Sequence, residues 1–133
     1  MENIGRITQE NINYLKENEI FVFGANLSYR HGAGAAKQAL NFGAKYGYSG
    51  LQGKTYGIPT KDKNIKTLPI SEIKPFVDEF IEFAKENSNL IFLVTEIGCG
   101  LAGYSQKDIA PLFKEAVNVS NVHLSNSFWN ELK

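Results

Sequence analysis

The class of fold is indicated most clearly by the stretch Ile20-Phe21-Val22-Phe23-Gly24-Ala25-Asn26, which joins an apolar strand directly to a glycine-containing loop. The loop continues as His31-Gly32-Ala33-Gly34-Ala35-Ala36 and leads into an alanine-rich segment. The pattern returns where Leu90-Ile91-Phe92-Leu93-Val94 precedes Ile97-Gly98-Cys99-Gly100-Leu101-Ala102-Gly103-Tyr104. A short, continuous apolar run bounded by turn residues is typical of a strand buried on both faces. Two central strands are therefore predicted, each followed by a glycine-rich loop.

The remaining elements alternate between strands and helices. Strands are predicted at 4–7, 20–23, 55–59, 90–94 and 119–124, and helices at 8–18, 35–45, from 71 onward, 105–117 and 127–132. Segments 47–53 and 60–67 are expected to be loops, and the strand at 55–59 is expected to end at Pro59. This order predicts one domain, residues 1–133, of the α/β class: a three-layer α/β/α sandwich with a mostly parallel mixed sheet.

Both glycine loops are suited to binding an anion. Glycine lets backbone N–H groups approach a ligand closely, and a strand-to-helix turn directs those groups and the helix dipole toward it. Ligands of such sheets bind beyond the carboxyl ends of the strands. If the two apolar strands are neighbours, the loops face each other across a cleft. The sequence therefore predicts a site for a pair of phosphates.

Composition narrows the classes of partner. The chain has 14 Lys and Arg and 14 Asp and Glu, so its net charge of zero argues against general binding of nucleic acid or of an anionic membrane. One cysteine and two histidines, without metal-ligand spacing, predict no metal and no cofactor. Because no signal-peptide pattern and no apolar run of membrane-spanning length occur, a cytoplasmic protein without a membrane partner is expected.

Neither loop matches the common nucleotide-binding motifs. No Gly-Lys-Ser/Thr follows the glycines, which excludes a Walker P-loop. Residues 98–103 match Gly-x-Gly-x-x-Gly literally, but they lie late in the chain and lack the acidic ribose partner about 20 positions on. A nicotinamide dehydrogenase is therefore not expected.

The loops resemble those of macrodomains, the α/β modules that bind ADP-ribose. Gly24-Ala25-Asn26 with residues 31–36 is similar to the first macrodomain loop, and Ile97-Gly98-Cys99-Gly100-Leu101 to the loop that wraps the diphosphate. Gly5-Arg6-Ile7-Thr8 stands where macrodomains carry Gly-Asp-Ile-Thr. Ile58-Pro59-Thr60-Lys61 brings the chain nearest to the terminal ADP-ribose glycohydrolase branch, and it also resembles small bacterial and phage macrodomain-like proteins. The resemblance covers nearly the whole chain.

The resemblance implies a role for each matching position. The first loop would meet one phosphate and the distal ribose, the second would wrap the diphosphate, and Phe128 or Trp129 would stack on a base. The glycohydrolase branch uses a lysine nucleophile, which Lys61 matches, and Asn26 and Asp62 are further catalytic candidates. The implied ligand-binding residues are Gly24, Ala25, Asn26, His31, Gly32, Ala33, Gly34, Ala35, Ile97, Gly98, Cys99, Gly100, Leu101, Ala102, Gly103, Tyr104 and Phe128.

Two positions depart from the family pattern. Arg6 replaces an aspartate that often accepts a hydrogen bond from adenine, and a guanidinium only donates. Ala102 replaces the aspartate with which the hydrolase branch completes product release, and alanine transfers no proton. Cys99 fits a small buried thiol better than a nucleophile. Tyr104 fits a ribose contact or packing against the sheet equally well, and His31 fits a phosphate contact or a solvent-facing imidazole.

Two functions follow from these residues. The first is a hydrolase that removes ADP-ribose or cleaves a related metabolite, with Lys61, Asn26 or an activated water at the distal ribose. The second is a non-catalytic module that reads or sequesters ADP-ribose, a related nucleoside diphosphate or an ADP-ribosylated macromolecule. Lys61 favours the first function and Ala102 the second. A structural or phage-borne interaction protein with a vestigial cleft is the weaker third hypothesis.

Overall fold

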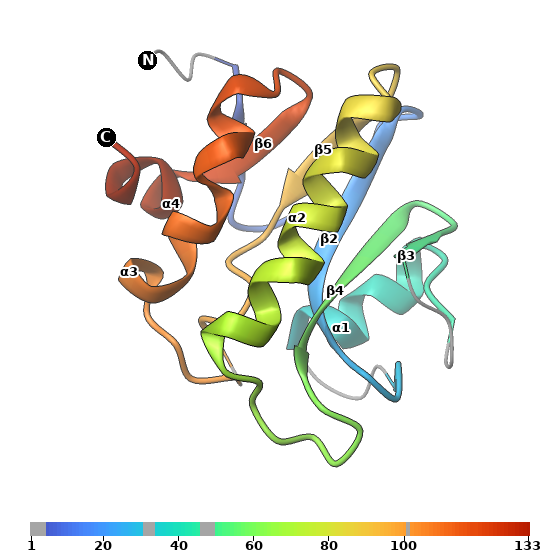
Figure 1. The fold of residues 1–133 in the computed structure, drawn as a ribbon. Coiled ribbons are helices and arrows are strands. Elements are labelled where there is room, and N and C mark those ends of the chain that lie inside the picture. The colour runs from blue at the N-terminus through green and yellow to red at the C-terminus, as the bar shows by residue number, and fades with distance from the viewer. Residues whose placement is uncertain (1–4, 31–33, 46–49, 101) are drawn as a thin grey trace.

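A mostly parallel mixed sheet forms the centre of the molecule (Figure 1). The computed structural model describes residues 5–30, 34–45, 50–100 and 102–133. Within these ranges the six strands have the order β1-β6-β5-β2-β4-β3, and β3 alone runs antiparallel to its neighbour. The α/β class and the mixed sheet confirm that part of the prediction. The elements, with η for a 3₁₀ helix, are β1 Ile7–Thr8, β2 Glu19–Asn26, α1 Gly34–Ala39, η1 Leu40–Phe42, β3 Gly50–Gln52, β4 Thr55–Lys61, α2 Ile70–Glu86, β5 Ile91–Val94, α3 Gln106–Ile109, η2 Ala110–Asn118, β6 Val122–Ser125 and α4 Asn126–Glu131.

Strand β2 is central because its side chains are apolar on both faces. Ile20 and Val22 point into a large core with α2, η2 and α4, whereas Phe21 and Phe23 point into a smaller core on the opposite face. The strand pairs in parallel with β4 on one side and β5 on the other. The two strands that precede the glycine loops are thus neighbours, as the predicted cleft requires.

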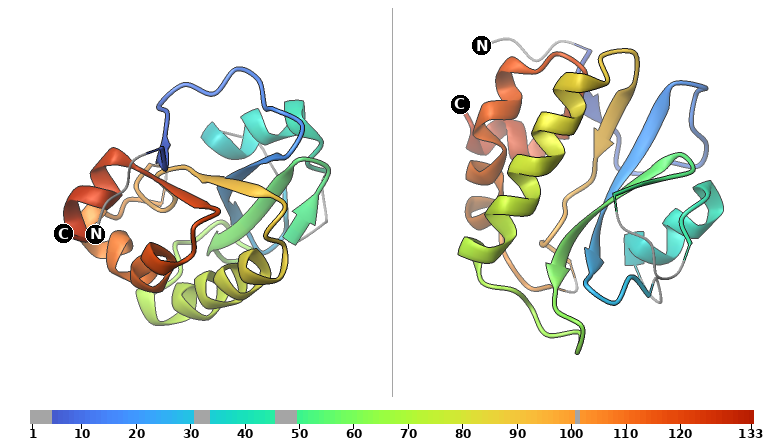
Figure 2. Two further views of the ribbon diagram at one scale, coloured as in Figure 1. Left: turned by 90° about the horizontal axis from the view of Figure 1, so that it is seen from above. Right: turned by 45° about the vertical axis from the view of Figure 1, so that its right-hand side comes forward.

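The two faces of the sheet are covered unequally. Helix α2 and the α3–η2 segment lie along one face, and Figure 2 shows α1 and the extended segment 9–18 on the other. On α2 the residues that face the core recur at helical spacing: Ile73, Val77, Phe80, Ile81 and Ala84 are buried. None of the described helices combines the length and the hydrophobicity needed to span a membrane.

The helix predicted at 8–18 is wrong, because the segment beyond β1 is extended and irregular. Ile12 is nevertheless buried in the smaller core. The backbone carbonyls find partners on other elements: Gln38 donates to the carbonyl of Ile12, and the Lys54 ammonium donates to those of Leu15 and Lys16. Apolar positions at helical spacing therefore predicted the buried face correctly and the backbone conformation incorrectly.

Two predicted loops contain strand residues. Gly50–Gln52 forms β3, which pairs with β4 no farther than Gly57 in the described chain. Strand β4 continues through Pro59 to Lys61, whereas the predicted strand ended at the proline. Pro59 lies beyond the segment that pairs with β3, a position where its missing N–H costs no hydrogen bond to that strand. This continuation buries Thr60, which the prediction placed in a loop.

The helix predicted at 105–117 changes type after one turn. Asp108 accepts hydrogen bonds from the backbone N–H and the hydroxyl of Ser105, which fixes the start of α3. From Ala110 onward the chain is a 3₁₀ helix. Pro111 lies at the start of this 3₁₀ segment, where its missing N–H removes one α-helical hydrogen bond and its ring crowds the preceding turn.

Arg6 closes the carboxyl-terminal end of η2. Its guanidinium donates to the carbonyls of Ala116, Val117, Val119 and Val122 at distances of 2.8 to 3.2 Å. It also lies 5.0 Å from the centroid of the Trp129 ring, whose N–H donates to the Arg6 carbonyl. A cation at this end of a helical segment complements the exposed carbonyls and the helix dipole. An arginine at position 6, where the resemblance implied an aspartate, is thus explained by its contacts with the end of η2.

Replacing Arg6 by methionine is predicted to lower the free energy of unfolding by about 2 kcal/mol, because several carbonyls lose their donor at once. Urea denaturation followed by circular dichroism measures the change. Arg30→Met is the matched control, since the Arg30 guanidinium is exposed and contacts no polar group in the described chain. Equal midpoints for the two variants would contradict the assigned role of Arg6.

Candidate functional site

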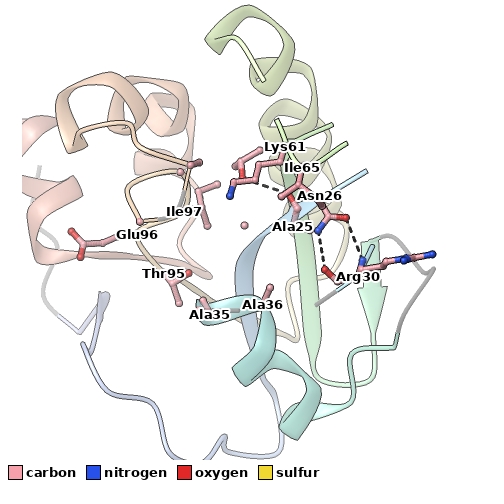
Figure 3. Close-up of a pocket in the computed structure, with 16 residues that line it drawn as sticks. Ala25, Asn26, Arg30, Ala35, Ala36, Lys61, Ile65, Thr95, Glu96 and Ile97 are labelled. Atoms are coloured by element: carbon pink, nitrogen blue, oxygen red, sulfur yellow. Dashed lines mark hydrogen bonds between the residues drawn. The ribbon is translucent and has the colours of Figure 1, made fainter. Parts of the chain in front are cut away.

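A pocket of about 530 Å³ opens at the carboxyl ends of β2, β4 and β5 (Figure 3). Its volume lies in the range of small-molecule sites. Both glycine loops contribute to its wall, so the predicted meeting of the two loops is confirmed for their described residues. The described residues that line the pocket are Gly24, Ala25, Asn26, Arg30, Gly34, Ala35, Ala36, Thr60, Lys61, Ile65, Thr95, Glu96, Ile97, Gly98, Gly100 and Ala102.

Most of the described candidate residues line this pocket. Those that do not are Asp62, Cys99, Gly103, Tyr104 and Phe128. His31, Gly32, Ala33 and Leu101 lie outside the described residues. Sequence reasoning missed Arg30, Ala36, Thr60, Ile65, Thr95 and Glu96 as lining residues. Thr95 and Glu96 could have been predicted from the sequence, because they lie between the strand predicted at 90–94 and the loop that begins at Ile97. No sequence pattern indicated Ile65.

The first loop is organised by Asn26 at the end of β2. The pairing of β2 with β4 shifts register between Ala25 and Asn26, which sets Asn26 opposite Lys61. The Asn26 side-chain oxygen accepts from the N–H groups of Ser28 and Arg30, and its amide nitrogen donates to the Arg30 carbonyl at 2.8 Å. The side chain thus holds the turn that follows β2. Its catalytic role stays a prediction.

The second loop packs directly against the first. A Cβ added to Gly24 would lie 3.6 Å from the backbone nitrogen of Gly98 and 3.6 Å from the Cβ of Ile97. Gly98 itself has a φ of +76°, and a Cβ there would lie 2.8 Å from the Cδ1 of Ile109. The positive φ of Gly98 and the contact with Ile109 therefore favour glycine there, whereas at Gly24 the tight neighbour of an added Cβ is the Thr60 hydroxyl at 3.3 Å and the distances to the second loop are ordinary van der Waals contacts.

Tyr104 fixes the second loop from outside the pocket. Its hydroxyl donates to the Leu68 carbonyl at 2.6 Å, and its backbone N–H donates to the Gly98 carbonyl. The Thr67 hydroxyl donates to the Ala102 carbonyl at 2.9 Å, which adds a further hydrogen bond between the second loop and the segment before α2. Of the two interpretations of Tyr104, the structure supports packing against the protein.

Lys61 supplies the charge of the pocket. Its side chain reaches into the cavity toward Ile97, whereas the charged ends of Arg30 and Glu96 are turned away from the cavity (Figure 3). The Glu96 carboxylate accepts hydrogen bonds from Gln106 and Ser127. Lys61 forms no ion pair within the described chain. The described part of the pocket thus presents one cation and no carboxylate.

Asp62 does not reach the pocket, although it was a catalytic candidate. Its carboxylate accepts from the backbone N–H groups of Asn64 and Lys66 at 2.8 and 2.9 Å. These bonds, together with the 2.8 Å bond from the Asp62 N–H to the Lys66 carbonyl, close the loop after β4. The side chain organises this loop and is turned to its own backbone rather than to the cavity.

The assignment of Phe128 to base stacking is wrong. The ring is fully buried, at 0% exposure, and stacks on Phe113 with a centroid distance of 5.7 Å. Helix α4 buries it because the N-cap Ser125 accepts from the Phe128 N–H and turns the chain back onto η2. Trp129, the competing candidate, is also buried and donates its ring N–H to the Arg6 carbonyl.

Cys99 fits the interpretation of a partly buried thiol. Burial, followed by the negative charges of Glu96 and Asp108, raises the pKa of Cys99 to about 11. A thiol with so high a pKa is protonated at neutral pH and is a weak nucleophile. It does not line the pocket, and its backbone N–H donates to the Glu96 carbonyl within the turn.

No protein-family model, no curated protein and no solved structure matches this chain.

Two glycines of the second loop are predicted to differ in their tolerance of a side chain. Gly98→Ala is expected to cost roughly 1–3 kcal/mol of unfolding free energy, because of its positive φ and the contact with Ile109. Gly100→Ala is expected to cost less than about 0.5 kcal/mol, because no described atom lies within 4 Å of the added methyl group. Thermal and urea unfolding of both variants test this difference, and similar losses would contradict the described loop geometry.

Proposed function

We propose that the pocket binds ADP-ribose or a related nucleoside diphosphate, and that the protein reads or sequesters this ligand rather than hydrolysing it. The observation that carries the proposal is the meeting of two glycine loops across one pocket into which Lys61 projects (Figure 3). The macrodomain resemblance of both loops supplies the identity of the ligand. An ADP-ribosylated macromolecule is a candidate partner, because it carries the same group.

Free backbone donors support an anionic ligand. In the described chain, the N–H groups of Gly98 and Gly100 donate to no protein acceptor, although both residues line the pocket. Gly98 is buried, and a buried N–H without a partner is costly, so a bound oxyanion would satisfy it. Gly100 is exposed, and its N–H is open to a ligand. The hydroxyls of Thr60 and Thr95 donate to the carbonyls of Ala25 and Val22 and are already engaged. The available donors are therefore the loop amides and the Lys61 ammonium.

The residues at the pocket favour binding over hydrolysis. A hydrolase of this type needs a group that transfers a proton near the scissile bond. Ala102 lines the pocket at the position where the glycohydrolases that this chain resembles have an aspartate. The carboxylate of Glu96 is turned away, toward α3 and α4. Lys61 alone supports the hydrolase, since it matches the nucleophilic lysine of that branch and projects into the cavity.

Calorimetric titration with ADP-ribose is predicted to show binding by the wild-type protein and about tenfold weaker binding by Lys61→Gln, which loses one charge-assisted hydrogen bond to phosphate. Lys63→Gln is the matched control, because Lys63 is exposed on the loop that follows Lys61 and does not line the pocket. Absence of heat and of a thermal shift at millimolar ADP-ribose would reject the proposed ligand.

An assay of ADP-ribose release distinguishes a non-catalytic binding module from a hydrolase. Incubation with an ADP-ribosylated protein is expected to leave the modification in place. Release of ADP-ribose by the wild type, lost in Lys61→Gln and kept in Lys63→Gln, would establish the hydrolase instead.

A further inference from the structure

Ile65 combines two unfavourable features at the pocket. Its φ is +62°, a left-handed conformation that β-branched residues rarely adopt. Its side chain is 49% exposed, so burial within the protein compensates little for the strained backbone. Ile65 lines the pocket on the same side as Lys61 and Asn26 (Figure 3). An exposed apolar group in a strained conformation at a binding pocket calls for a functional explanation.

The loop that carries Ile65 does not need an isoleucine there. The Asp62 bonds described above close the loop, and the Ile65 N–H donates to the Asp62 carbonyl at 3.1 Å. An isolated bridge between Lys61 and Thr67 joins the two ends of the loop. All these contacts use backbone groups or the Asp62 carboxylate. Asparagine or glycine would adopt the same φ with less strain.

We propose that Ile65 is a ligand contact that packs against the apolar face of a sugar attached to the bound phosphates. This inference rests on the proposed function and deepens it. The loop amides and Lys61 recognise phosphate oxygens, which ADP-ribose and inorganic pyrophosphate both provide. An apolar side chain at the same pocket has no favourable contact with pyrophosphate, whereas it buries area against the carbon face of a pentose. Ile65 thus gives the site selectivity for sugar-linked diphosphates.

Ile65→Asn separates the ligand contact from the loop conformation. The variant is expected to bind ADP-ribose about five- to tenfold more weakly, which corresponds to the loss of about half an isoleucine side chain of buried area. Its affinity for inorganic pyrophosphate is expected to stay unchanged. Its Tm is expected to rise by about 3–6 °C, since asparagine tolerates the left-handed conformation. Calorimetry with the two probes and thermal unfolding without ligand give the three values.

Two further variants serve as controls. Ile65→Val keeps both the strained conformation and most of the apolar face, so it should retain ADP-ribose affinity within about twofold and show no gain in Tm. Leu51→Asn removes an aliphatic side chain that is similarly exposed but lies on β3, away from the pocket. It should leave the affinity for ADP-ribose unchanged.

The outcomes distinguish this inference from the proposed function. Weaker ADP-ribose binding with unchanged pyrophosphate binding and a higher Tm supports it. If the wild type binds ADP-ribose and Ile65→Asn binds it equally well, the contact with Ile65 is rejected and the proposed function stands. If both probes lose affinity equally, or if the Tm falls, Ile65 has a structural role and the inference is overturned. If the wild type does not bind ADP-ribose, both proposals fail.

Discussion

The parallel pairing of β2 with β5 is the constraint on which the pocket depends. Both strands are apolar on both faces, so they occupy the middle of the sheet, and their carboxyl ends emerge at the same edge. The chain leaving each strand must then pass very close to the other. At Gly24 an added Cβ would already be in van der Waals contact with Gly98 and Ile97 of the second loop, and at Gly98 it would strike Ile109.

Local patterns predicted the elements that rest on local physics. The apolar runs, the long amphipathic helix α2 and the glycine loops gave the class of fold and most described lining residues. The extended segment 9–18 could not be predicted, because the groups that satisfy its carbonyls come from Gln38 and Lys54. Phe128 was misread for the same reason, because its partner Phe113 is distant in sequence, and no local pattern indicated that Arg6 would meet the end of η2.

The pocket is built for recognition more clearly than for chemistry. Gly98 and Gly100, whose N–H groups donate to no acceptor in the described chain, line the pocket together with Lys61, and Ile65 adds an exposed apolar side chain. The carboxylate of Glu96, which lines the pocket, accepts from Gln106 and Ser127, and that of Asp62 accepts from its own loop. This division of roles explains why binding is proposed with catalysis as the alternative.

An NMR titration of the ¹⁵N-labelled protein with ADP-ribose tests the central claim most directly, because it reports on each backbone amide separately. If the proposed site is correct, the largest shift changes occur at Gly98 and Gly100, and the amides on the solvent-exposed face of α2, such as those of Lys74 and Glu82, do not shift. Changes concentrated away from the two loops, or none at millimolar ADP-ribose, would contradict it.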